Sequence, residues 1–65
     1  MEETTKRQMR LAISQMELTL GFFGAMMCDH SLEEEERDVI TRTMEDLEIA
    51  CDRLRKMQEK AEARP

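Results

Sequence analysis

The strongest constraint on this chain is the spacing of its apolar residues, which recur at alternating steps of four and three residues in both halves. Such spacing keeps one stripe on the same side of an α-helix for many turns. The sequence therefore predicts two long helices, each with an apolar seam to bury. The seam residues are Met9, Ile13, Met16, Leu20, Phe23 and Met27 in the first half, and Ile40, Met44, Leu47, Cys51 and Leu54 in the second.

The two seams are mirror images about residue 30. Folded at that point, the chain places Leu20 opposite Ile40 and Met9 opposite Cys51, with two further matching layers between them. An unrelated pair of helices would rarely match in successive layers. The spacing thus predicts an all-α fold, an antiparallel two-helix hairpin, which we expect to dimerise into a four-helix bundle.

Capping signals place the ends of the predicted helices. Thr5 with Gln8, and Ser31 with Glu34, match a capping box, in which two side chains each bond a free backbone N–H of the first turn. The expected segments, within a single domain 1–65, are a first helix at about 5–28, a turn at 29–31 and a second helix at about 32–62. Two glycines leave open whether the first helix ends near Gly24 or continues to Cys28.

A chain of 65 residues is short for a self-sufficient core. Cores of this size rarely supply more than about 3–5 kcal/mol, so a disulfide, a metal or a partner chain is usually needed. In the mirrored hairpin Cys28 and Cys51 lie about 30 Å apart along the axis, whereas a disulfide needs Cα atoms within about 7 Å. Unpaired thiols favour a cytoplasmic location. The most apolar stretch, Leu18 to Cys28, is too short to span a membrane.

A second set of apolar residues lies on the first helix, away from its seam. These residues are Leu11, Leu18, Phe22 and Ala25. A helix that packs on one side alone should be polar there, so this pattern indicates that the first helix is covered on both sides. Either a second copy of the chain, in an antiparallel homodimer, or a helical segment of another protein could cover it.

The net charge of −5 is unevenly distributed. Acidic residues concentrate around the predicted turn, and most basic residues lie near the two termini, at the open end of the hairpin. Two hairpins packed head to tail would therefore bring opposite charges together. Overall acidity disfavours nucleic acid as a partner. A nucleic-acid-binding regulator that uses the open end is nevertheless the alternative, and its residues would be Lys6, Arg7, Arg10, Arg53, Arg55 and Lys56.

Little in the chain suggests metal binding or catalysis. Cys28, Asp29 and His30 are consecutive, with Glu33 and Glu34 close by, but no second histidine or short cysteine pair completes a closed zinc site. Catalytic, cofactor-binding and metal residues are therefore not expected. The sequence predicts a small non-enzymatic protein-interaction module, such as an adaptor, co-chaperone or regulator, that self-associates through helical packing.

Overall fold

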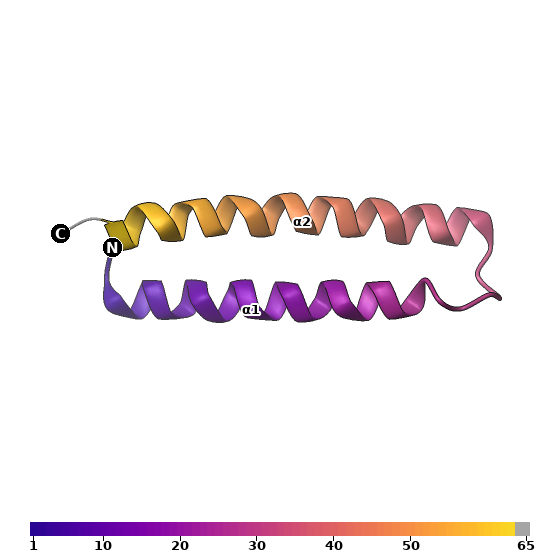
Figure 1. The fold of residues 1–65 in the computed structure, drawn as a ribbon, viewed down its shortest axis with the longest axis horizontal. Coiled ribbons are helices and arrows are strands. Elements are labelled where there is room, and N and C mark those ends of the chain that lie inside the picture. Colours follow the sequence, from indigo (N-terminus) through magenta and orange to yellow (C-terminus); the bar gives the residue numbers. More distant parts are fainter. Residues whose placement is uncertain (64–65) are drawn as a thin grey trace.

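The computed structural model describes residues 1–63, and it shows two helices that lie antiparallel and side by side (Figure 1). Helix α1 spans Glu3–Met26 and helix α2 spans Glu34–Ala63. The two pack against each other along an elongated molecule of 51 × 15 × 12 Å. The predicted all-α two-helix hairpin is therefore confirmed. Arg64 and Pro65, which belong to the predicted domain 1–65, lie outside the described residues.

The first helix begins and ends earlier than its predicted bounds of 5–28. Glu2 occupies the N-cap position and makes no side-chain capping bond, so the predicted capping box of Thr5 and Gln8 is wrong. Glu3 and Thr4 already belong to the helix, because nothing such as proline stops it before Thr5. At the other end α1 runs through both glycines to Met26.

The interface between the helices contains the predicted seam. Met9, Ile13, Ile40 and Cys51 are buried, and so is Ala61, which the spacing argument did not include. The other seam residues are half-buried; they are Met16, Leu20, Phe23, Met27, Met44, Leu47 and Leu54. A 4–3 stripe on each helix therefore supplies the apolar contact between the helices, as the periodicity requires.

The predicted register between the helices is wrong. With the mirror about residue 30, Ala61 would lie beyond Met1, where α1 could not cover it. Ala61 is nevertheless only 6% exposed. Glu17 pairs with Arg55 at 2.6 Å, whereas the mirror places it opposite Thr43. Helix α2 is therefore displaced toward the turn. The repeat permits this because, after a shift by one layer, seam residues of α1 still face seam residues of α2, although in different pairs.

The second helix begins later than predicted, and different residues cap it. The carboxylate of Glu36 accepts a 2.9 Å hydrogen bond from the backbone N–H of Glu33, which is the N-cap position of α2. The predicted box of Ser31 and Glu34 is wrong because Ser31 is used in the turn. Its N–H and its hydroxyl both donate to Oδ1 of Asp29, at 2.9 and 2.7 Å. This is an Asx turn, which competes with capping for the same hydroxyl.

Arg37 closes the hairpin at the turn. Its guanidinium donates to the backbone carbonyl oxygens of Met27 at 3.1 Å and Asp29 at 2.7 Å. The last carbonyl groups of a helix have no partner within the helix, and no residue here adopts the left-handed conformation that often ends one. A side chain of α2 therefore completes the end of α1 and fixes the two helices to each other.

Candidate interaction surface

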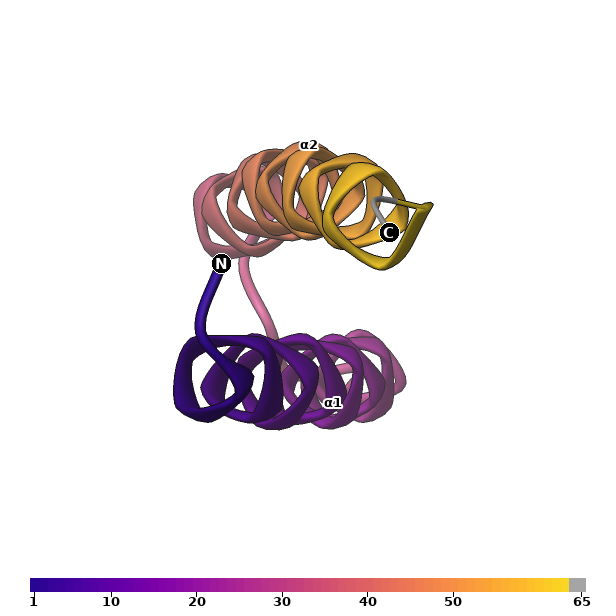
Figure 2. The ribbon, with the colours of Figure 1, turned by 90° about the vertical axis from the view of Figure 1, so that its left-hand side faces the viewer.

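The predicted interaction residues form an exposed apolar face on α1. Leu11, Leu18 and Phe22 are 57%, 54% and 60% exposed, and Ala25 is exposed as well. Each lies two residues from a seam residue, which is about 200° round the helix. The face is therefore on the opposite side of α1 from α2. Viewed along the hairpin, no other part of residues 1–63 lies beyond α1 on that side (Figure 2).

Two ion pairs join α1 to α2, and the two α1 residues that make them lie seven residues apart, on the same side of the helix. Arg10 pairs with Glu62 at 3.6 Å, and Glu17 pairs with Arg55 at 2.6 Å. The hydrogen bond from Arg55 to Glu17 raises the pKa of the guanidinium. Between Leu11 and Cys28, Glu17 is the sole charged residue of the chain, and its charge is compensated by α2. The apolar face of α1 therefore has no charge of its own.

The turn end of the hairpin is strongly acidic. Hydrogen bonds from the N–H and hydroxyl of Ser31, helped by the positive charge of Arg37, hold the pKa of the Asp29 carboxyl below its usual range. Asp29 therefore stays ionised, and Glu33 to Glu36 add four further carboxylates at the start of α2. The positive end of the α2 dipole favours negative charge at this position.

The basic residues of the open end are largely paired with carboxylates. Besides the two ion pairs between the helices, Lys6 lies 3.5 Å from Glu3 and Lys56 lies 3.0 Å from Asp52. Four of the six basic residues of the nucleic-acid hypothesis thus have an acidic neighbour, namely Lys6, Arg10, Arg55 and Lys56. Exposed pairs of this kind are weak, but they reduce the positive potential that phosphate binding needs.

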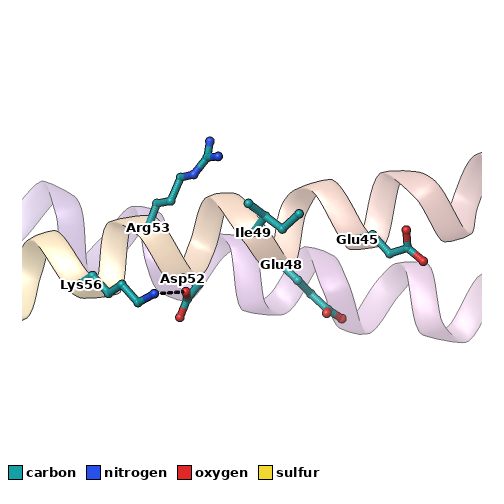
Figure 3. Close-up of a pocket in the computed structure, with 6 residues that line it drawn as sticks. All are labelled: Glu45, Glu48, Ile49, Asp52, Arg53 and Lys56. Carbon is teal, nitrogen blue, oxygen red and sulfur yellow. Dashed lines mark ion pairs between the residues drawn. The ribbon is translucent and has the colours of Figure 1, made fainter.

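A shallow depression on α2 offers no site for a substrate. Its lining comes entirely from the outer face of α2 (Figure 3), and the residues are Glu45, Glu48, Ile49, Asp52, Arg53 and Lys56. Ligand sites enclose most of a small molecule between several elements, whereas one helix presents a convex surface. The exposed side chain of Ile49 stands here among charged neighbours, without a second large apolar residue in the group.

Cys28, Asp29 and His30, which the sequence argument weighed as metal ligands and set aside, lie in or next to the turn. Among residues 1–63, no three histidine, cysteine, aspartate or glutamate side chains are arranged so that they could hold a metal ion. Cys28 is exposed, Cys51 is buried, and both are free thiols. Over the same residues, neither helix combines the length and the apolarity that crossing a membrane requires.

In comparisons with known proteins, no family model, no curated protein and no solved structure matches the chain. The description of the site therefore rests on its own geometry.

The sequence argument did not predict the structural role of Arg37, although an arginine so near the start of α2 is unusual. Positive charge is disfavoured at a helix N-terminus, and this departure was the available signal.

Proposed function

We propose that this protein is a small non-enzymatic protein-interaction module that self-associates through helical packing, two hairpins forming a four-helix bundle. The observation that carries the proposal is the uncharged apolar face of α1 on the side away from α2. Leu11, Leu18 and Phe22 are all more than half exposed in the single hairpin. A helix that is apolar on both sides is typical of the interior of an assembly.

The exposed area of the hairpin supports a partner of ordinary size. A compact folded chain of 7.7 kDa exposes about 4300 Å², but the hairpin exposes 5238 Å². The excess of about 900 Å² is close to the roughly 800 Å² that each partner buries in a stable complex. Contact with one partner of ordinary interface size would therefore reduce the exposed area of the hairpin to the value expected for its mass.

Burial of this face would contribute favourable free energy to association. Covering a leucine or phenylalanine side chain completely contributes about 1.5–3 kcal/mol. Leu11, Leu18 and Phe22 are already partly shielded, so together they offer roughly half of the full value, about 2–5 kcal/mol. Ala25 and the aliphatic parts of neighbouring side chains add to this.

The two free thiols support a reducing compartment, and we propose that the protein is cytoplasmic.

The experiment compares substitutions at two positions that are similarly exposed in the single hairpin. Leu18 on α1 and Ile49 on α2 are 54% and 52% exposed, and both lie in the middle of a helix. We expect Leu18→Asp to abolish association in sedimentation equilibrium, while helix content by circular dichroism falls only in part. Ile49→Asp is the matched control and should leave association unchanged.

Equal behaviour of the two variants would contradict the proposal. If both associate as the unaltered chain does, the face of α1 is not an interface. If both dissociate equally, added charge weakens association wherever it is placed, and the face of α1 has no special role.

A further inference from the structure

The apolar face of α1 is symmetric about one of its own residues. Leu11 lies seven residues before Leu18 and Ala25 lies seven after it, while Ser14 and Phe22 lie four before and four after. If two copies of α1 run antiparallel with their Leu18 residues level, Leu11 lies beside Ala25 and Ser14 beside Phe22. Each large side chain then meets a small one, and Leu18 meets its own copy. A two-fold interface requires this kind of self-complementarity.

The same register brings opposite charges together at both ends of the face. Arg7 lies four residues before Leu11, so it continues the apolar face toward the open end. It lies eleven residues before Leu18, and Asp29, in the acidic turn, lies eleven after. Because α1 ends at Met26, this register brings the open end of one copy, with Arg7, next to the turn of the second copy, where Asp29 lies. Within the part of the chain that the structure describes, Arg7 makes no ion pair.

We infer, on the basis of the proposed self-association, that the partner is a second copy whose α1 packs antiparallel against α1 with the two-fold axis at Leu18. The two α1 helices form the centre of the four-helix assembly, and the two α2 helices lie outside. A square bundle would bury two adjacent sides of each helix. The two apolar faces of α1 are instead on opposite sides, about 200° apart, so a copy on the far side of α1 is required to cover both.

Disulfide formation between introduced cysteines tests this register. The background is Cys28→Ser, which removes the exposed thiol and leaves the buried Cys51. In a glutathione redox buffer, Leu18→Cys should form at least tenfold more covalent dimer than Ile49→Cys, because residues at the axis lie within the Cα separation of about 7 Å that a disulfide needs. Ile49 is the control because it has similar exposure on the other helix.

A mixing experiment fixes the direction of the two helices. Leu11 residues of the two copies are fourteen residues apart along the axis, about 21 Å, so Leu11→Cys alone should give only the level of the Ile49→Cys control. A mixture of Leu11→Cys and Ala25→Cys should form the disulfide-linked heterodimer. Efficient linkage of Leu11→Cys to itself would instead show parallel helices and overturn the inference.

The mass of the background chain separates this inference from the proposed function. A noncovalent dimer in which Leu18→Cys links no better than Ile49→Cys would overturn the register and leave self-association standing. A background chain that sediments as a monomer at every concentration would overturn both.

Discussion

The two helices of the hairpin present different surfaces to their surroundings. Helix α2 has one apolar seam, and charged residues recur in every turn of its remaining surface. Helix α1 has the same kind of seam but a second apolar face opposite it, and from Leu11 to Cys28 its only charge is Glu17. The proposed self-association gives α1 a second neighbour and leaves α2 with one.

This contrast is the basis for proposing that the apolar face of α1 is an interaction surface. Both helices expose some large apolar side chains, such as Val39 and Ile49 on α2. Single exposed apolar residues among charges are ordinary on protein surfaces. What distinguishes α1 is that Leu11, Leu18, Phe22 and Ala25 share one face, and such a pattern is typical of an interaction site.

The largest expected effect comes from the seam, where the two helices should behave alike. Ile13 on α1 and Ile40 on α2 are 6% and 8% exposed. Truncation of either to alanine should lower the free energy of unfolding by about 2–4 kcal/mol, because it leaves a cavity in the contact between the helices. Urea denaturation at one fixed protein concentration measures the loss. A cost for Ile13 only would mean that the seam is not shared as described.

A smaller loss is expected at the point where α2 holds the end of α1. Arg37→Ala removes two charge-assisted hydrogen bonds to the carbonyl groups of Met27 and Asp29, and we expect it to lower the free energy of unfolding by about 1–2 kcal/mol. Arg42→Ala is the control, since Arg42 is an exposed arginine one turn further along α2. Denaturation midpoints of the two variants should differ. Equal midpoints would remove Arg37 from the account of the turn.

The glycines of α1 separate folding from association. In the single hairpin, a Cβ atom added at Gly21 or Gly24 meets nothing within 4 Å. Each change to alanine should therefore stabilise the helix, by up to about 1 kcal/mol. Gly21 borders the apolar face at Leu18 and Ala25, and Gly24 lies nearer the seam. We expect Gly21→Ala alone to weaken the dimer, a few-fold by sedimentation. Equal dimer affinities for both variants would place the partner helix elsewhere.

The smallest effect is a dependence on acid at the turn. The folded-state pKa of Asp29 is lowered by Ser31 and then by Arg37, so its ionised form stabilises the fold above the ordinary pKa of an aspartate. This contribution should be lost as the pH falls from about 4 through the lowered folded value. Asp29→Asn keeps an acceptor but does not titrate. The stability difference between the chain and this variant should shrink on acidification, and a constant difference would contradict the assignment.

The parts of the fold that depend on local periodicity could be predicted from the sequence, and the parts that depend on the turn could not. The seam from Met9 to Leu54 follows from helical spacing alone. The register does not, because a one-layer shift preserves the seam, and the shift is visible in the buried Ala61 and in the ion pair of Glu17 with Arg55. Caps were missed because several candidates compete: Ser31 bonds Asp29, and Glu36 takes the role expected of Glu34.

The candidate site followed from the sequence for the same reason. Leu11, Leu18 and Phe22 are recognisable by their distance of two residues from the seam, which needs no knowledge of the register between the helices. The ion pair of Glu17 with Arg55 depends on that register, and so it could not be predicted. Sequence periodicity therefore identifies which face is apolar, and the structure adds that nothing within the described chain covers it.

The mass of the unaltered chain in solution tests the central claim most directly. Sedimentation equilibrium at moderate salt should give twice the 7.7 kDa of the chain at micromolar concentration. The dimer should weaken as salt screens the attraction between the acidic turn and the basic open end. A monomer of 7.7 kDa over the whole concentration range would contradict the account, if it does not aggregate and Leu18 and Phe22 are in contact with water.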